Sequence, residues 1–432
     1  MHIYFSGIGG TGIGPLALIA HQAGFEVSGS DKQESSYLDY LRSHGVADIT
    51  VGQTEVAIAA AHAKSPIDWF VYSSALPKEN PEHPELKFVE VNKIKHSKRD
   101  GFLNHLLREK SLKLLAIAGT HGKTTTTAMM IWLFKQLKMP ISYNVGAKLS
   151  FGEMGKYDPK SEYFVYECDE YDRNFLSFSP HLSVISGIDW DHADVYPTKE
   201  SYNKAFREFI DEKSSEVIIW QDDAKKLQLY RGDEGKSIVT DIKNDDPTLD
   251  LITLPGLVNR KDACLVMWAV SAITGKPLDE LAEHLNRFPG VSRRFEALQP
   301  SLYSDYAHTP PKIEGALQLA HEVAGENVVV VYEGLHNTRQ HFIKSELKHM
   351  FDSAKTLYMV PSYLAREDPS LKLLTPEDLV ALTSQPEKAH PAALDDNLRS
   401  NIVKHLAEGD LVLCITAGGG GSLDEWLRKN FS

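Results

Sequence analysis

Residues 114–127 combine an apolar strand with a turn whose composition suits phosphate binding. The segment reads LLAIAGTHGKTTTT. Backbone N–H groups at such a turn converge on phosphate oxygens at the start of a helix, the lysine supplies charge, and the next hydroxyl binds Mg²⁺. The predicted phosphate-binding residues are Gly119, Thr120, His121, Gly122, Lys123, Thr124 and Thr125. The spacing is shorter than the usual G-x-x-x-x-G-K-[ST], and the alternative is an ordinary strand, turn and helix.

A second glycine-rich turn near the N-terminus satisfies the pattern G-x-G-x-x-G. It follows a predicted strand at 3–6 and precedes a predicted helix at 15–23. Its glycines let a pyrophosphate approach the backbone, and an aspartate at the end of the next strand can bind ribose hydroxyls. The residues concerned are Gly7, Gly9, Gly10, Thr11, Gly12 and Asp31. NAD, FAD and a nucleotide-sugar diphosphate share these groups, but two phosphate turns in one chain favour one nucleotide as substrate and another as energy source.

Two acidic clusters follow later predicted strands. Residues 167–172 read ECDEYD, and residues 189–194 read DWDHAD. Open α/β sheets bind ligands at the carboxyl ends of their strands, and Mg²⁺ prefers oxygen ligands. One or two of these carboxylates beside Thr124 would suit the metal, whereas solvated loop residues are the alternative. His121 and His192 are either metal-associated groups or polar surface residues.

Further candidates lie towards the C-terminus. Arg293 and Arg294 precede a predicted domain boundary, and one guanidinium is suited to reach a phosphate across a cleft, whereas solvated surface residues are the alternative. Asp305, at a strand end, offers a carboxylate for ribose. The glycine turn 418–421 either holds an anion at the start of the helix 423–429 or is only a permissive turn.

The elements that must position these residues alternate between strands and helices, which predicts an α/β fold. We expect three domains: a Rossmann-like domain at 1–110, a central P-loop ATPase-like mononucleotide-binding domain at 111–297, and a Rossmann-like domain at 298–432. The main predicted strands are 3–6, 26–29, 69–74, 88–91, 114–118, 163–167, 182–186, 216–220, 327–332, 356–360 and 410–416.

Composition excludes several classes of protein. The 432 residues are 42% hydrophobic and 24% charged, as in an ordinary globular protein of two or three domains. A net charge of −13 argues against sequence-independent binding of nucleic acid. Three scattered cysteines without a CxxC pair predict neither disulfides nor structural zinc, and they fit a cytoplasmic location. Neither a signal peptide nor a membrane-spanning segment is expected.

Taken together and in this order, the motifs resemble those of the Mur ligase family, ATP-dependent amide-forming enzymes of peptidoglycan precursor synthesis. The similar segments are AGTHGKTTT at 118–126, the acidic cluster at 167–172, DH at 191–192, RRFE at 293–296 and DYAH at 305–308. They run through all three predicted domains. The opening GIGGTG and the SGSD at 28–31 look most like the branch that joins L-alanine to UDP-N-acetylmuramate, whose N-terminal domain binds the UDP part.

The resemblance implies roles for individual residues. Lys123 and Thr124 would serve the ATP phosphates, while Thr124, Glu167 and His192 would hold Mg²⁺, or Mn²⁺ in its place. Asn259, Arg294 and Asp305 would contact adenine, phosphate and ribose. Ser73 and Ser74 would help to hold the UDP moiety, and the incoming amino acid would meet His308, Arg339 and the turn 418–421.

The chemistry implied by the resemblance is carboxylate activation. The lactyl carboxylate of UDP-N-acetylmuramate attacks the ATP γ-phosphate, and the amine of L-alanine then attacks the resulting acyl phosphate. Lys123 and Arg294 would stabilise the transferring phosphoryl group together with the metal. Either His192 or His308 would assist proton removal from the amine. Hinges near Ser111 and Glu296 would let the domains close and exclude water.

Some segments depart from the family pattern. Residues 256–262 read GLVNRKD and keep only the first expected asparagine, Asn259. Residues 332–339 read YEGLHNTR, in which Glu333, Asn337 and Thr338 are similar to the recycling branch that attaches L-Ala-γ-D-Glu-meso-diaminopimelate to the same nucleotide sugar. Arg207 stands where some sister ligases carry a carbamylated lysine, so no carbamylation is expected here.

Three alternative functions therefore stay open on the sequence. The recycling ligase is the nearest of them. A NAD(P)-dependent oxidoreductase would use the N-terminal glycine turn and leave the second one unused. A non-catalytic nucleotide-binding protein would bind through both turns without forming an amide. The chain is expected to be a monomer or a homodimer.

Overall fold

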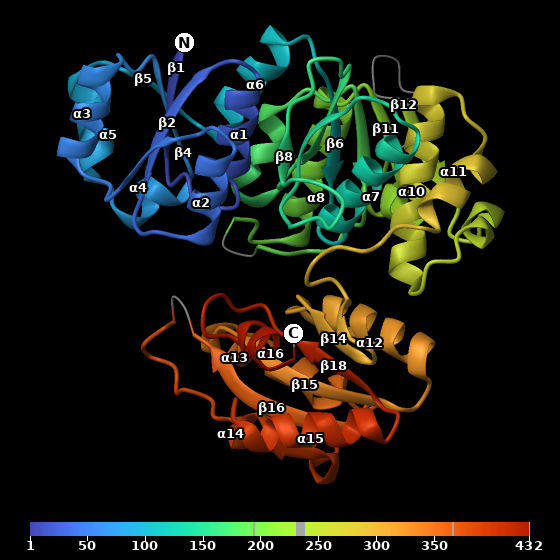
Figure 1. The fold of residues 1–432 in the computed structure, drawn as a ribbon. Helices are drawn as coiled ribbons and strands as arrows, with labels where there is room; N and C mark the ends of the chain where they lie inside the picture. The colour runs from blue at the N-terminus through green and yellow to red at the C-terminus, as the bar shows by residue number, and fades with distance from the viewer. Residues whose placement is uncertain (193–194, 230–237, 365–366, 432) are drawn as a thin grey trace. The chain divides into compact units, whose positions relative to one another are not determined.

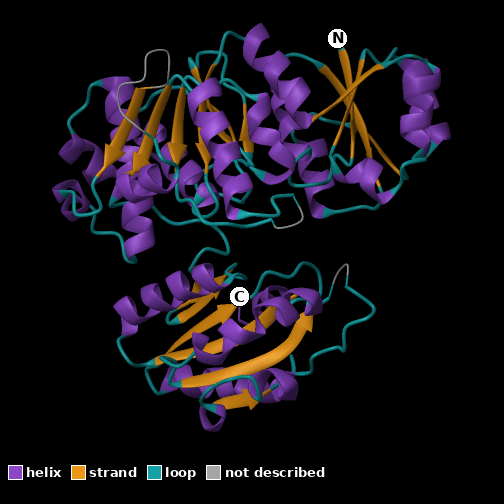
Figure 2. Cartoon of the chain, turned by 180° about the vertical axis from the view of Figure 1, so that it is seen from behind, coloured by secondary structure: helices purple, strands orange, loops and turns teal. Residues whose placement is uncertain are grey.

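The computed structural model describes residues 1–192, 195–229, 238–364 and 367–431. They form two compact units (Figure 1). The first unit comprises residues 1–252 and 262–288, and the second comprises residues 253–261 and 289–432. In both units the strands of a sheet lie side by side with helices packed against them (Figure 2).

The first unit opens with a parallel sheet of five strands in the order β3-β2-β1-β4-β5. The strands are β1 (His2–Ser6), β2 (Glu26–Asp31), β3 (Asp48–Val51), β4 (Trp69–Tyr72) and β5 (Lys95–Lys98). The helices are α1 (Gly14–Gln22), α2 (Ser36–Ser43), α3 (Glu55–Lys64), α4 (Ala75–Glu79), α5 (Pro84–Val91) and α6 (Arg99–Glu109). The strand order reverses between β1 and β4, which is where such sheets bind ligands.

The predicted strand at 88–91 is wrong, because these residues form the last turn of α5. The alternation of Phe88, Val89, Glu90 and Val91 imitates a strand. Pro84 at the first helical position starts a helix instead, and the apolar residues Leu86 and Val89, three apart, share its buried face. Val91 is left 81% exposed. The edge strand next to β4 is instead β5, in a charged segment that carried no strand signal.

The first unit continues with a seven-stranded sheet in the order β12-β11-β10-β6-β9-β7-β8, in which β8 pairs antiparallel with β7 and the other pairs are parallel. The strands are β6 (Lys113–Ala118), β7 (Ser142–Asn144), β8 (Gly155–Lys156), β9 (Tyr163–Glu167), β10 (Leu182–Ile185), β11 (Glu216–Trp220) and β12 (Ile238–Ile242). The helices are α7 (Lys123–Gln136), α8 (Lys199–Glu208), α9 (Gln221–Lys226), α10 (Leu257–Thr274) and α11 (Leu278–Leu285); the start of α10, up to Lys261, belongs to the second unit. The four predicted strands of this block are confirmed as β6, β9, β10 and β11.

The second unit holds a six-stranded sheet in the order β13-β14-β18-β15-β16-β17. The strands are β13 (Glu296–Gln299), β14 (Leu302–Asp305), β15 (Val328–Leu335), β16 (Thr356–Tyr363), β17 (Ala389–Pro391) and β18 (Leu411–Ile415). The helices are α12 (Pro310–Ala324), α13 (Asn337–Met350), α14 (Pro376–Val380), α15 (Asp396–Ala407) and α16 (Leu423–Phe431). Only β13 and β14 pair antiparallel. The division of the chain at residues 110 and 297 stays a prediction.

Apolar side chains fill the space between sheets and helices, and the cysteines lie among them. Cys168, Cys264 and Cys414 are buried and unpaired. Burial raises the pKa of the Cys264 thiol to about 11 and raises the pKa of Cys168 and Cys414 further. Among the described residues, we find no helix with the length and apolar character needed to cross a membrane.

Candidate functional site

The N-terminal glycine turn leaves β1 at the carboxyl edge of the first sheet. Gly7 has a φ of 74°, which favours glycine, and its N–H donates to Ser30 O over 2.8 Å. Asp31, predicted to bind ribose, accepts hydrogen bonds from Gly9 N at 2.7 Å and from Lys32 N at 2.7 Å. Its carboxylate therefore holds the turn in shape. The ribose contact stays a prediction.

A buried carboxylate that the sequence did not reveal lies beneath this edge. Glu85 is fully buried and accepts hydrogen bonds from the hydroxyls of Tyr4 at 2.9 Å, Ser6 at 2.6 Å and Ser30 at 2.5 Å. Burial raises the pKa of Glu85, although the three hydroxyls partly oppose the shift. The network connects β1 and β2 to the start of α5, so it holds together the elements that lie beneath the glycine turn.

Beside this network lies a cavity of about 340 Å³ in the first unit. Its lining carries amide, imidazole, ammonium and carboxylate groups as well as apolar surface, contributed by Lys32, Gln53, Leu76, Glu79, Asn80, His83 and Pro84. Ser73 and Ser74 directly precede α4, which supplies part of the lining, and Ser74 is the N-cap of that helix. The cavity offers both polar recognition and an apolar surface, as small-molecule sites do.

The second phosphate turn connects β6 to α7. Gly119 and Gly122 have φ values of 140° and 79°. A side chain at Gly122 would come within 2.8 Å of Asp262 Oδ1, so the backbone approaches α10 closely. Helix α7 begins at Lys123 without a side-chain cap, which leaves its first N–H groups for another acceptor. This end of α7 fits an anion such as a phosphate.

Lys123 is held over this turn by a buried ion pair. Its Nζ donates to Gly119 O and to Glu170 Oε2, each at 2.6 Å. The Glu170 side chain is fully buried and that of Lys123 is 14% exposed. Burial alone would raise the pKa of Glu170, but the charge of Lys123 and a hydrogen bond from His192 hold it below its usual value. For Lys123 burial is opposed by Glu170, and the pKa is raised.

Glu170 is the centre of a wider network. His192 Nε2 lies 3.5 Å from Glu170 Oε1, and the Tyr202 hydroxyl lies 3.4 Å from the same oxygen. Tyr202 also contacts the Thr120 hydroxyl at 2.6 Å. Burial would lower the pKa of His192, but Glu170 and the neighbouring Asp191 raise it. Nothing in the pattern of residues 167–172 separates Glu170 from the other acids of its cluster.

The predicted metal ligands are brought together only in part. The Thr124 hydroxyl donates to Glu167 Oε1 at 2.9 Å, and Glu167 Oε2 accepts from Gly146 N at 3.2 Å. His192 instead pairs with Glu170. The hydroxyl and carboxylate oxygens fit a hard divalent cation. Metal binding by Thr124, Glu167 and His192 stays a prediction.

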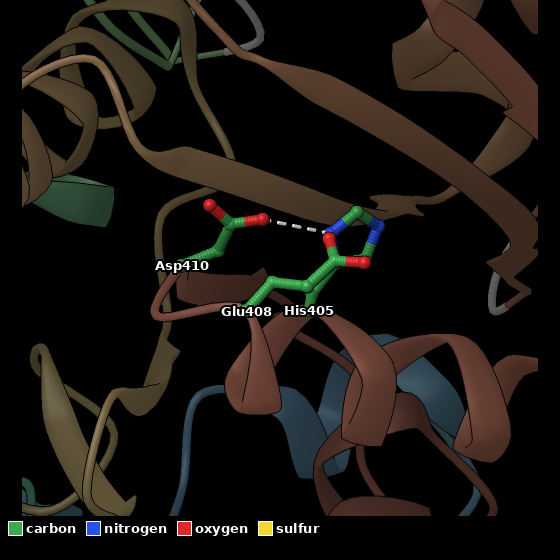
Figure 3. Close-up of side chains that lie close together, drawn as sticks. All are labelled: His405, Glu408 and Asp410. Carbon is green, nitrogen blue, oxygen red and sulfur yellow. Dashed lines mark hydrogen bonds and ion pairs between the residues drawn. The ribbon is translucent and has the colours of Figure 1, made fainter.

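The only geometric cluster of three metal-ligating side chains in the described parts of the chain lies elsewhere, in the second unit (Figure 3). It consists of His405, Glu408 and Asp410. His405 Nδ1 contacts Asp410 at 2.9 Å, and Lys355 Nζ donates to both Asp410 oxygens at 2.7 and 2.9 Å. The lysine supplies the positive charge that a metal would bring, so this cluster is a structural ion pair.

Strained backbone accompanies the Glu170 network. Asp172, Arg173 and His192 have φ values of 57°, 58° and 55°, in the left-handed region that side chains other than glycine seldom adopt. Asp172 pairs with Lys98 at 3.0 Å and Arg173 pairs with Glu208 at 2.5 Å. Such strain persists only where surrounding contacts impose it, and it gathers at functional sites.

The remaining predicted residues belong to the second unit. Asp305 accepts hydrogen bonds from Phe295 N and Ala307 N, each at 2.7 Å, and burial raises its pKa. Asn259 Nδ2 donates to Pro255 O at 2.9 Å. The Arg294 guanidinium lies 5.0 Å from the centre of the Tyr306 ring, a cation–π contact. Adenine, phosphate and ribose contacts by Asn259, Arg294 and Asp305 stay predictions.

His308 lies in a cationic environment. Burial, together with the charges of Lys312, Arg339 and Arg294, lowers its pKa to about 3, so the imidazole is neutral at neutral pH. Its Nδ1 contacts Tyr306 O at 2.9 Å. Three cations near one neutral imidazole suit a ligand that carries a carboxylate.

The residues similar to the recycling branch have internal partners. Glu333 accepts from the Thr416 hydroxyl at 2.5 Å and from Leu423 N at 2.9 Å. Asn337 bridges Lys372 O and Leu374 N. The Thr338 hydroxyl donates to Glu367 at 3.1 Å. These three side chains hold neighbouring loops in place.

Two family models match the chain. The one described as Mur ligase family, catalytic domain, matches residues 2–111, and the one described as Mur ligase middle domain matches residues 117–251. A UDP-N-acetylmuramate–L-alanine ligase from Nocardioides sp. is 31% identical over 427 residues, which cover 96% of this chain and 93% of that protein. A protein of the same name from Caldanaerobacter subterraneus is 28% identical over 449 residues, covering 96% and 95%.

Solved structures share the fold. A UDP-N-acetylmuramate-alanine ligase from Thermotoga maritima matches with a TM-score of 0.71 at 24% identity, over 97% of this chain and 96% of that one. A murein peptide ligase from Psychrobacter arcticus matches with a TM-score of 0.64 at 21% identity, over the same shares. The predicted α/β fold is confirmed. Because the family models together match more than half of the residues and a relative above 30% identity spans nearly the whole length, the chain belongs to the Mur ligase family.

Proposed function

We propose that this protein uses ATP to join L-alanine to the lactyl carboxylate of UDP-N-acetylmuramate, releasing ADP and phosphate. The observation that carries the proposal is the 31% identity to a UDP-N-acetylmuramate–L-alanine ligase, which extends over 93% of that protein. The site agrees with it, because the first unit contains two separate places suited to a nucleotide. One is the glycine turn with its cavity, and the other is the turn before α7.

ATP belongs at the turn before α7. The uncapped helix start accepts phosphate oxygens, and the Lys123 ammonium lies over the turn, held there by Glu170. Thr124 and Glu167 would hold Mg²⁺, or Mn²⁺, whose charge would neutralise that of the phosphates. Electrostatic stabilisation of this kind supplies most of the catalysis in phosphoryl transfer. Because Glu170 fixes the position of Lys123, that charge is already placed when the substrate arrives.

The UDP part of the substrate belongs at the edge of the first sheet. The glycine turn lets a diphosphate approach the backbone, and the neighbouring cavity of about 340 Å³ has the size and mixed lining to hold a nucleoside. The buried hydrogen bonds of Glu85 keep this edge rigid. The substrate therefore meets a preformed surface.

The amino acid belongs in the second unit, near His308. Arg294, Lys312 and Arg339 surround that neutral imidazole with positive charge and suit the carboxylate of L-alanine. The same cations would also accept an acceptor peptide with several carboxylates, so this cluster does not choose between the two acceptors. We also propose that the protein works in the cytoplasm, where its three unpaired cysteines would stay reduced.

The test is phosphate release from ATP and Mg²⁺ with UDP-N-acetylmuramate, together with mass analysis of the product. L-alanine, glycine, L-serine and the tripeptide L-Ala-γ-D-Glu-meso-diaminopimelate are supplied separately. Turnover with L-alanine is expected. Turnover with the tripeptide alone would assign the protein to recycling. If folded protein binds the nucleotide sugar but turns over none of these acceptors, the ligase proposal fails.

A further inference from the structure

Arg99 is the first residue of α6 and directly follows the carboxyl end of β5. The glycine turn leaves the carboxyl end of β1, and β4 pairs with both strands in parallel, so both features lie at the same edge of the sheet. A Cβ on Gly12 would come within 2.7 Å of Arg99 Nη1. The guanidinium therefore lies directly against the backbone of the glycine turn, where a side chain on residue 12 would displace it.

The contacts of Arg99 leave its hydrogen-bonding capacity unused. Its one ion pair, from Nη2 to Asp169 Oδ2, spans 3.8 Å, which is too long for a hydrogen bond. Within the described ranges the guanidinium donates no hydrogen bond, although it carries five donors. Its side chain is only 27% exposed. At this exposure the donors still reach water, and a bound anion would replace that water with charge-assisted hydrogen bonds.

Neighbouring cations differ from Arg99 in this respect. Lys98 donates to Asp172 at 3.0 Å. Lys78 lies 3.8 Å from the same carboxylate and over the Tyr171 ring. Both lysines therefore serve the contact between α4, β5 and the segment after β9. Arg99 is the cation at this edge that combines a loose ion pair with direct contact to the glycine turn.

We propose that Arg99 binds the diphosphate of the nucleotide-sugar substrate. The proposal rests on the proposed function and names one of the residues that would recognise the substrate. A guanidinium matches two phosphate oxygens in a bidentate arrangement. The N–H groups of Thr11 and Gly12, which donate no hydrogen bond to the described residues, supply further donors, whereas those of Gly7, Ile8, Gly9 and Gly10 already have acceptors within the protein. Asp169 lies 3.8 Å from Nη2, so its charge attracts the guanidinium without taking up a donor.

Two variants and a matched control test the proposal. Arg99→Gln removes the charge, and Arg99→Lys keeps the charge but lacks the paired N–H donors of the planar guanidinium. Arg108→Gln removes the same charge from the last turn of the same helix, at an exposed position. Isothermal titration measures the binding of UDP and of uridine to each full-length protein. Arg99→Gln should weaken UDP binding at least about 10-fold, Arg99→Lys should fall between it and the wild type, and Arg108→Gln should match the wild type.

The uridine titration separates phosphate recognition from structural damage. Uridine affinity, the KM for ATP and the Tm should stay the same in Arg99→Gln. If Arg99→Gln binds UDP as tightly as the wild type, the proposal is overturned. A parallel loss of uridine and UDP affinity, or a lower Tm with loss of both, would show a structural role and also overturn it. If the wild-type protein itself binds neither UDP nor UDP-N-acetylmuramate, the proposed function fails instead.

Discussion

Replacing Glu170 with Gln isolates the charge that holds Lys123. Gln has nearly the same volume and keeps an oxygen that accepts a hydrogen bond from Nζ, so no cavity forms. The change leaves the Lys123 ammonium in a site where its own side chain is 14% exposed and its partner's is fully buried, so water cannot replace the lost charge. Removing one member of a buried pair typically costs about 3–5 kcal/mol.

We expect Glu170→Gln to lower the free energy of unfolding by about 3 kcal/mol, the lower end of that range, because the side-chain oxygen of Gln still accepts a hydrogen bond from Lys123 Nζ. At about 2 °C per kcal/mol for a unit of this size, the Tm of the first unit should fall by about 6 °C. Differential scanning calorimetry gives the value. The pKa of Glu170 is lowered and that of Lys123 raised, so this pair stays charged between about pH 6 and pH 8. Glu170 also raises the pKa of His192 above its ordinary 6.5, so the deficit of Glu170→Gln should be larger at about pH 6, where His192 is protonated, than at about pH 8.

Glu162→Gln is the matched control. Glu162 pairs with Lys113 at 2.7 Å in the same unit, but the two side chains are 58% and 48% exposed. Water screens and replaces such a pair, so no measurable change in Tm is expected. An equal fall in Tm for Glu170→Gln and Glu162→Gln would refute the argument that burial sets the strength of the Lys123 pair.

Three further predictions concern activity and pH. Lys123→Met should lower kcat at least about 100-fold in the phosphate-release assay while leaving UDP affinity unchanged, and an unchanged kcat would exclude Lys123 from phosphoryl transfer. The pKa of His308 is lowered to about 3, so below its ordinary 6.5 the unfolded chain binds a proton that the folded unit excludes, and stability falls as the pH drops through this window. Between about pH 7 and pH 5, the Tm of His308→Gln should therefore fall by less than the Tm of the wild type. An equal fall in both proteins would contradict this. Chelation of divalent cations should abolish ligase turnover, and added Mg²⁺ should restore it; turnover that persists in the chelator would exclude a metal.

The parts of the fold that could be predicted depend on local patterns. Short apolar runs followed by glycine turns locate β1, β6 and the other buried parallel strands, and both phosphate turns show at their glycines. The segment at 88–91 could not be assigned in the same way, because alternating apolar and polar residues fit one turn of a half-buried helix as well as a strand. There the proline at the start of α5 was the stronger signal.

The candidate site could be predicted only as clusters of residues. The pattern 167–172 locates a set of acids, but the choice of Glu170 depends on Lys123, which lies 47 residues away along the chain. Glu85 depends on Tyr4 over 81 residues. Arg99 lies in a charged segment, 93–109, in which no motif was recognised. Each pairing joins residues that are far apart along the chain, so it becomes visible only once the sheets are assembled.

The three buried cysteines allow the opening of each unit to be measured separately. A thiol reacts as the thiolate, and burial suppresses the thiolate in all three by raising its pKa. Cys168 and Cys264 lie in the first unit, whereas Cys414 lies in the second. Alkylation followed by peptide mass analysis would therefore time the opening of each unit separately, in one sample of the unaltered protein. Adding a nucleotide would then reveal which unit it protects.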